Sequence, residues 1–176
     1  MTPTVPALTA TAAIAALQRN RIDHVVTVPD WVQLAMHARL QSGVEGIRLI
    51  NCSNENQTVT VAAGLTVGGK RPLLVMQNQG LYNCVNTLRA VCLDARIPMV
   101  LMVGQFGREF DNIGKPSTQS RRTMVRIMEP LLQAMGVPFH CLDTDADLVK
   151  MDEAFEQAQA QRTAVVLLVS GPMAWQ

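Results

Sequence analysis

The sequence predicts a doubly wound α/β domain with a mostly parallel, six-stranded sheet and helices on both faces. Short apolar runs rich in Val, Ile and Leu alternate about six times with longer stretches of helical periodicity. Several runs are apolar at nearly every position, which is typical of parallel strands covered on both faces. Right-handed crossovers between such strands give a flavodoxin-like arrangement that binds ligands at the carboxyl ends of the strands.

The six expected strands are short apolar runs that stop at polar or turn-forming residues. They cover residues 24–28, 47–51, 73–76, 98–103, 138–142 and 164–169. Parallel strands end at one edge of a sheet, so the loops after the first four strands should gather there.

The expected helices lie before and between these strands and have plausible caps. They cover residues 9–20, 31–41, 54–67, 81–95, 120–135 and 146–161. Polar residues that can accept from first-turn amides are Asp30 and Ser53 or Asn54. Glycines that follow helix ends are Gly43, Gly68, Gly69 and Gly136.

Composition and charge exclude several classes of protein. With 176 residues, 48% of them hydrophobic, we expect residues 1–176 to form a single domain with one well-buried core. The net charge of +1 comes from scattered acids and bases, so neither nucleic acid nor a membrane is an expected partner.

The four cysteines and the N-terminus favour a reduced, cytoplasmic protein. No cysteine belongs to a C-x-x-C pair or has a histidine at zinc-finger spacing, so we expect core thiols and no metal site on this chain. The sequence has no signal-peptide pattern and no run approaching the roughly 20 apolar residues of a membrane helix. We therefore expect a cytoplasmic location.

One long irregular stretch, residues 104–119, follows the fourth strand at the expected ligand edge. Connections of this length in compact domains are usually functional or mobile. Basic residues in and after it could attract an anionic substrate or a partner's carboxylates, although a solvated basic face is the simpler interpretation. They are Arg108, Lys115, Arg121, Arg122 and Arg126.

Glu55 begins the third helical stretch, shortly before the polar segment Gln77-Asn78-Gln79-Gly80. An acid in the first turn of a helix is favoured by the macrodipole and needs no further role. A carboxylate and a polar cluster at the ends of neighbouring strands can also build a ligand site.

Several segments together resemble the pyrimidine-binding domain of thiamine-diphosphate enzymes. They are Val28-Pro29-Asp30, Glu55 through Gly64, Lys70-Arg71-Pro72, Met76 through Asn83 and Ile97-Pro98. The likeness covers roughly residues 24–140 and is closest to the alpha subunit of sulfopyruvate decarboxylase and the corresponding half of phosphonopyruvate decarboxylase. It implies the thiamine-diphosphate pyrimidine-domain type of the fold.

The resemblance implies that Glu55 is catalytic and binds the cofactor. In that family a glutamate nine residues before the glycine that closes its helix contacts N1′ of the aminopyrimidine, and Glu55 and Gly64 have this spacing. A carboxyl group in a low-dielectric pocket can share a proton with N1′ and so promote loss of the proton from the thiazolium carbon.

Other residues of the motifs receive weaker assignments. The resemblance implies that Gln77 and Asn78 lie on the substrate side of the site, where their amides could hold a carboxylate, although a turn also explains them. Gly80 allows close backbone approach to the cofactor, and Asn83 supports the cofactor-binding loop. Asp30 either faces the substrate or is a plain N-cap.

A missing motif implies a partner. These enzymes bind the diphosphate through a metal held by Gly-Asp-Gly and a later Asn, and this chain contains no Gly-Asp pair. The resemblance therefore implies a free-standing alpha subunit that is inactive alone. A separate diphosphate-binding beta subunit would hold Mg²⁺ and complete the thiamine diphosphate site.

We therefore expect the alpha subunit of a heteromeric thiamine-diphosphate-dependent decarboxylase of a small 2-keto acid. A carboligase or carbon–carbon lyase of the same cofactor class, a non-catalytic stabilising or regulatory subunit, and a nucleotide-binding module are the alternatives. After Val28-Pro29-Asp30, where these relatives tend to carry Ser, this chain has Trp31. Just before the third helix, where they tend to carry an Arg and extra acids, it has Cys52-Ser53-Asn54. These changes suit a less polar substrate, while Trp31 could equally pack against the core or a partner.

Overall fold

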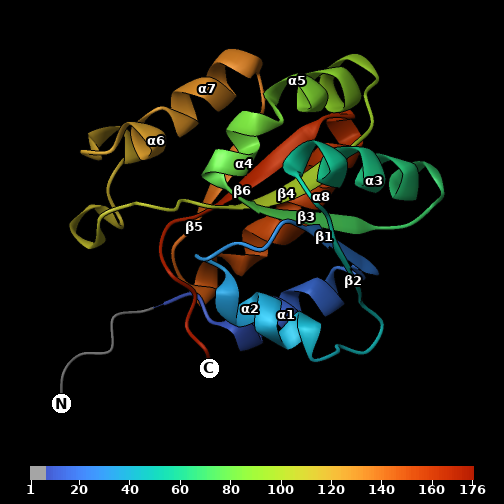
Figure 1. Cartoon of the computed structure of the whole chain (residues 1–176), viewed down its shortest axis with the longest axis horizontal. Coiled ribbons are helices and arrows are strands. Elements are labelled where there is room, and N and C mark those ends of the chain that lie inside the picture. The colour runs from blue at the N-terminus through green and yellow to red at the C-terminus, as the bar shows by residue number, and fades with distance from the viewer. Residues whose placement is uncertain (1–6) are drawn as a thin grey trace.

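A computed structural model of the protein describes residues 7–176 and has one six-stranded sheet, all of whose strand pairs are parallel. The strand order is β2-β1-β3-β4-β6-β5 (Figure 1). Every strand lies within one residue of its expected bounds. The strands are β1 His24–Thr27, β2 Arg48–Asn51, β3 Pro72–Gln77, β4 Met99–Gly104, β5 Phe139–Leu142 and β6 Ala164–Val169.

Helices cover both faces of the sheet, as expected for this fold class. On one face α1 (Ala10–Arg19), α2 (Leu34–Gln41) and α8 (Val149–Gln161) enclose one apolar cluster. The other face carries a second cluster beneath α3 (Glu55–Val67) and a series of shorter helices, which Figure 1 shows above the sheet. Alternate residues of β3 and β4 enter the two clusters, which explains why these strands are apolar throughout.

Two expected helices are divided. The stretch expected at 81–95 begins earlier and forms α4 (Asn78–Asn83), α5 (Val85–Leu88) and a π-helical segment, η1 (Arg89–Asp94). The stretch expected at 120–135 forms α6 (Thr123–Arg126) and α7 (Met128–Met135). Pro130 has no N–H, so one continuous helix would lose the hydrogen bond to the Arg126 carbonyl. In the first turn of α7 that N–H would have no partner within the helix, so a proline is tolerated there.

Two smaller differences concern helix starts. The helix expected from residue 31 begins at Leu34, and the one expected from 146 begins with the 3₁₀ turn η4 (Asp145–Leu148), capped by Thr144. Within residues 7–176, no helix is long and apolar enough to cross a membrane.

Candidate active site

The carboxyl ends of β1, β3 and β4 share one edge of the sheet, and the start of α3 and the whole of α4 lie beside it (Figure 1). Gln77 at the end of β3 pairs in register with Gly104 at the end of β4. The sequence-predicted site residues therefore belong to one region of the fold.

Glu55 occupies the first position of α3, where local hydrogen bonds fix the start of the helix. The N-cap is Asn54, whose side chain accepts from the Gln57 N–H at 3.0 Å. The Gln57 side chain in turn accepts from the Ser53 N–H at 2.8 Å. This reciprocal arrangement satisfies open amides and holds the half-buried Glu55 side chain at the helix terminus.

Gly80 and Asn83 of α4 form a cradle around the Glu55 carboxylate. Asn83 Nδ2 donates to Glu55 Oε2 at 3.1 Å. A Cβ added to Gly80 would lie 2.3 Å from Glu55 Cγ and 2.8 Å from Oε1. The glycine is therefore required here by the approach of the carboxylate, which is a packing reason for this residue that the motif alone does not reveal.

The buried thiol behind this cradle responds to Glu55. Burial, with a smaller contribution from the Glu55 charge, raises the pKa of Cys84 to about 12. Cys84 Sγ lies 3.9 Å from Met76 Sδ and points toward the Leu81 carbonyl. Cys84 therefore stays a neutral thiol at pH 7 and packs as a small apolar group, as expected for a core cysteine.

Gln77 is half-buried at the end of β3, and its side-chain amide has no hydrogen-bond partner in the described part of the chain. It immediately precedes α4, so its position is fixed by both the strand and the helix. An unengaged amide at this edge is free to bind a ligand, and its place on the substrate side stays a prediction.

Asn78 lies in a different environment from the one expected. Its side chain is fully buried, and Nδ2 donates to the Phe106 carbonyl at 3.0 Å and the Met124 carbonyl at 3.4 Å. Its Oδ1 accepts from the Gln79 N–H. The amide is thus fully engaged in joining α4 to the loop after β4, and the turn expected at residues 77–80 is instead the first part of a helix.

Asp30 is also turned into the protein and is only 1% exposed. Its oxygens accept from the Val32 N–H at 2.8 Å, Gln33 Nε2 at 2.6 Å and the Gly104 N–H at 3.1 Å. Burial outweighs these hydrogen bonds and raises the pKa of Asp30 to about 6. The N-cap interpretation is wrong, since α2 begins at Leu34, and the inward carboxylate does not support contact with substrate.

Trp31 follows Asp30 and is 64% exposed, so packing against the core is excluded for this indole. The next residue is tied to the C-terminal segment, because the Val32 carbonyl accepts from the Met173 N–H at 2.8 Å. Trp31 is therefore presented outward from a firmly held loop.

Gly64 does not close its helix. It lies inside α3, which continues to Val67 and ends at Gly68, followed by Gly69 with a positive φ of 78°. No atom lies within 4 Å of a Cβ added to Gly64. The spacing from Glu55 to Gly64 therefore has no steric cause in this chain alone.

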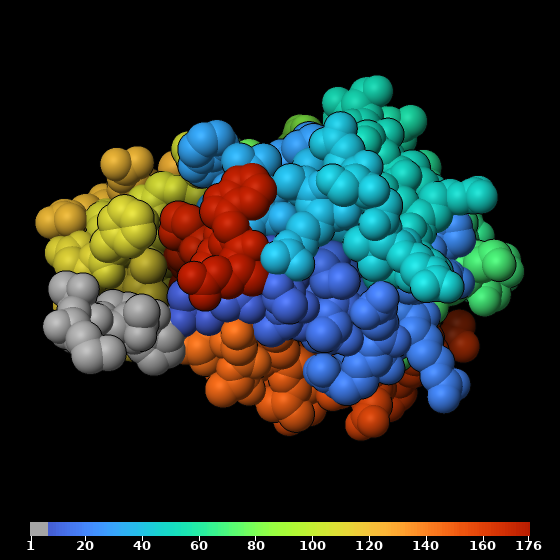
Figure 2. All heavy atoms as spheres, turned by 90° about the horizontal axis from the view of Figure 1, so that it is seen from below, coloured from blue at the N-terminus to red at the C-terminus, as the bar shows by residue number. Residues whose placement is uncertain are grey.

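Residues 104–119 form an ordered loop that is held together by the Arg108 side chain, a role that the sequence did not indicate. Arg108 donates to Gln105 Oε1, Ser170 Oγ, Asn112 and the Lys115 carbonyl. In Figure 2 the C-terminal segment lies between this yellow loop and the light-blue segment after β1. Arg108 is therefore a structural residue of the loop and no part of a solvated basic face.

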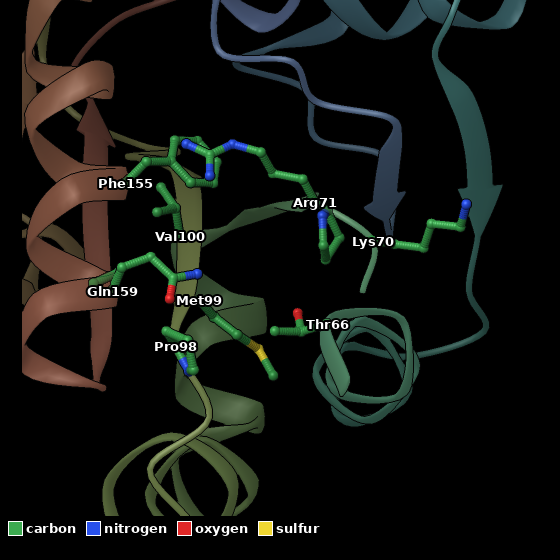
Figure 3. Close-up of a pocket in the computed structure, with 10 residues that line it drawn as sticks. Thr66, Lys70, Arg71, Pro98, Met99, Val100, Phe155 and Gln159 are labelled. Carbon is green, nitrogen blue, oxygen red and sulfur yellow. The ribbon is translucent and has the colours of Figure 1, made fainter. Parts of the chain in front are cut away.

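A small cavity lies away from this edge, at the amino ends of β3 and β4 (Figure 3). Its volume is about 20 Å³, room for a single water. The Arg71 guanidinium covers the Phe155 ring at 4.4 Å from its centroid, and Lys70 points away from the cavity. This cavity contains none of the predicted site residues and is too small for a substrate.

The residues present fit the pyrimidine part of thiamine diphosphate. Glu55 Oε1 has no hydrogen-bond partner among residues 7–176, while Oε2 is held by Asn83. In the same part of the chain, no cluster of three or more His, Cys, Asp or Glu could hold a metal ion. Glu55 therefore offers one free carboxylate oxygen to a ring nitrogen.

Comparisons with known proteins relate the chain to named decarboxylases. The chain is 29% identical over 128 residues to the sulfopyruvate decarboxylase alpha subunit of Methanothermobacter thermautotrophicus, covering 73% of this chain and 74% of that one. It is 28% identical over 113 residues to the phosphonopyruvate decarboxylase of Streptomyces viridochromogenes, covering 64% of this chain and 27% of that longer protein.

A solved structure shows the same fold at much lower identity. The 2-oxoglutarate:ferredoxin oxidoreductase of Magnetococcus marinus superposes with a TM-score of 0.67 at 11% identity, over 95% of this chain and 30% of that one. Residues 8–127 match the family described as thiamine pyrophosphate enzyme, N-terminal TPP binding domain. The expected fold class and resemblance are thus confirmed, and the chain belongs to the N-terminal TPP-binding domain family of thiamine pyrophosphate enzymes.

Proposed function

We propose that this chain is the pyrimidine-binding alpha subunit of a thiamine-diphosphate-dependent 2-keto acid decarboxylase. The observation that carries the proposal is the Glu55 carboxylate, which Asn83 holds at one oxygen and Gly80 permits to approach α4. The relatives named as sulfopyruvate decarboxylase alpha subunits support both the activity and the existence of a partner.

Thiamine diphosphate, when bound, supplies a nucleophilic carbon and takes up the electrons released by decarboxylation. Glu55 would hold a proton at Oε1, between its carboxylate and a nitrogen of the aminopyrimidine. Asn83 keeps the second oxygen in place, so the carboxyl group does not rotate away from the ring. The chain's contribution is thus the placement of one proton.

The substrate side of the site is formed by fewer residues than expected. Gln77 presents an unengaged amide that can donate to a carboxylate or a developing oxyanion. Asn78 and Asp30 instead hold the surrounding loops, through Phe106 and Gly104 respectively. We assign them positioning roles rather than contact with substrate.

A beta subunit would bind the diphosphate and Mg²⁺. The absence of a Gly-Asp pair from this sequence supports this division of labour. Free thiols at all four cysteines agree with a cytoplasmic enzyme. The isolated alpha subunit should therefore have no decarboxylase activity.

The test is Glu55→Gln in the complex reconstituted with the diphosphate-binding subunit. Turnover of 2-keto acids should fall at least about 100-fold, because proton transfer by a positioned side chain contributes roughly 10²- to 10⁴-fold. Glu156→Gln is the matched control, since Glu156 is an exposed carboxylate on α8, on the other face of the sheet.

Assembly must be measured on the same samples by sedimentation or gel filtration. Intact assembly with lost turnover supports catalysis by Glu55. Turnover equal to that of the wild-type complex would instead leave this chain as a non-catalytic stabilising or regulatory subunit. Product analysis with and without an added aldehyde separates decarboxylation from carboligation.

A further inference from the structure

The arginines around the carboxyl edge differ sharply in what they bind. Arg121 pairs with Asp111 at 3.3 Å and with Glu109 at 3.7 Å. Arg126 donates to the carbonyls of Ser120 and Arg121 and to Thr123 Oγ1. Together with Arg108, these side chains use N–H donors in hydrogen bonds or ion pairs within the loop and at the start of α6.

Arg122 is the exception. Its exposed guanidinium has no carboxylate, carbonyl or hydroxyl partner within residues 7–176. The side chain lies over Gly107. A Cβ added to Gly107 would lie 3.4 Å from both Cδ and Nη1 of Arg122.

Gly107 keeps this position open for two reasons. Its φ of 87° is in the left-handed region, where other residues are strained. A side chain there would also press on Met124 Sδ, at 3.3 Å, and on Arg122. The loop after β4 therefore turns in a way that lets the guanidinium lie directly on the backbone.

This place is close to the proposed substrate side. Gly107 follows Phe106, whose carbonyl is bound by Asn78 at the start of α4, one residue beyond Gln77. The Met124 carbonyl accepts from the same amide and from Tyr82 at 2.5 Å, so α6 is tied to α4. Figure 1 shows the loop and α6 extending beyond the ends of β3 and β4.

We propose that Arg122 is a specificity-determining residue that binds a second anionic group on the 2-keto acid, beyond its reacting carboxylate. This inference rests on the proposed function and deepens it. A guanidinium offers a planar pair of donors that matches a carboxylate or sulfonate. This proposal replaces the expectation of a less polar substrate.

The experiment compares Arg122→Gln with wild type in the reconstituted complex, using 3-sulfopyruvate and pyruvate as probes. We expect the KM for 3-sulfopyruvate to rise about 10- to 100-fold, the range for a lost charged hydrogen bond. Its kcat should change much less, and the KM for pyruvate, which lacks the second anion, should stay the same. Arg122→Lys should recover part of the loss.

Arg121→Gln is the matched control, because it removes the neighbouring exposed charge, which already has acidic partners. Equal rises in KM for both probes, or for both variants, would overturn the proposal. Loss of the beta subunit on gel filtration of the Arg122→Gln complex would also overturn it, since Arg122 would then bind acids of the partner.

A binding measurement separates this inference from the proposed function. The unreactive analogue 3-sulfolactate should bind the wild-type and Glu55→Gln complexes alike and the Arg122→Gln complex at least about 10-fold more weakly. Equal binding to all three complexes contradicts the role of Arg122 even if decarboxylation is observed. Weaker binding to Arg122→Gln supports it even where turnover fails.

Discussion

Gly80→Ala tests the cradle around Glu55 by adding a single methyl group. The new Cβ would lie 2.3 Å from Glu55 Cγ, well inside van der Waals contact, so one of the two must move. The backbone of α4 is fixed by the hydrogen bond from the Cys84 N–H to the Gly80 carbonyl at 3.1 Å. The carboxylate is therefore the group that moves.

The change should have opposing effects on stability and a large effect on binding. Displacing Glu55 breaks its 3.1 Å bond from Asn83, a charged hydrogen bond of about 1.5–3 kcal/mol that is weaker here because Asn83 is exposed. Alanine in a helix recovers about 1 kcal/mol. The variant should thus fold almost as well as wild type, while affinity for thiamine diphosphate falls about 10- to 100-fold from misplacement of the carboxylate.

Gly64→Ala is the matched control for helix propensity. Gly64 is exposed inside α3 with no atom within 4 Å of the added Cβ, so this variant should gain up to about 1 kcal/mol in urea denaturation of the chain. Titration calorimetry of the Gly80→Ala complex with thiamine diphosphate and Mg²⁺ measures the affinity. Wild-type affinity would refute the steric role of Gly80.

Two further perturbations address the residues that hold the edge. Because burial raises the pKa of Asp30 from 3.8 to about 6, the folded chain binds more protons than the unfolded chain between these values. The contribution of Asp30 to the free energy of unfolding should therefore fall as the pH rises through this window, by at most about 3 kcal/mol. Urea denaturation from pH 4 to 7 measures this, and a profile for Asp30→Asn that parallels wild type would contradict it. Asn78→Ala should cost about 1–3 kcal/mol and speed amide hydrogen exchange in residues 104–126, because the Phe106 and Met124 carbonyls lose a donor. Unchanged exchange would show that Asn78 does not hold the loop.

The strands were predictable because their cause is local. A fully apolar run such as β6, Ala164–Val169, can only be buried on both faces, and its bounds agree with the prediction at both ends. The start of α3 was predictable for a similar reason, since Asn54 caps its own helix. Glu55 could be singled out as a candidate because a motif and a helix start coincide at this residue.

The wrong predictions concern features that depend on contacts between residues far apart in the sequence. Gln77-Asn78-Gln79-Gly80 has the composition of a turn, yet it starts a helix because Leu81 and Asn78 are buried against the sheet and the loop after β4. Arg108 could not be separated from its basic neighbours by sequence, since its partner Ser170 is 62 residues away. The difference between Arg121 and Arg122 likewise depends on which side chain lies beside an acidic residue in the folded chain.

The direct junction between β3 and α4 bears on how substrate range can evolve. Gln77 ends the strand and Asn78 begins the helix, so no linker residue can absorb an insertion or a change of length there. Residues 105–122, between β4 and α6, form a long connection whose exposed side chains can vary without disturbing the sheet, while Asn78 and Arg108 hold its backbone. Divergence among relatives should therefore accumulate in that connection, while the cofactor side of the site stays under constraint.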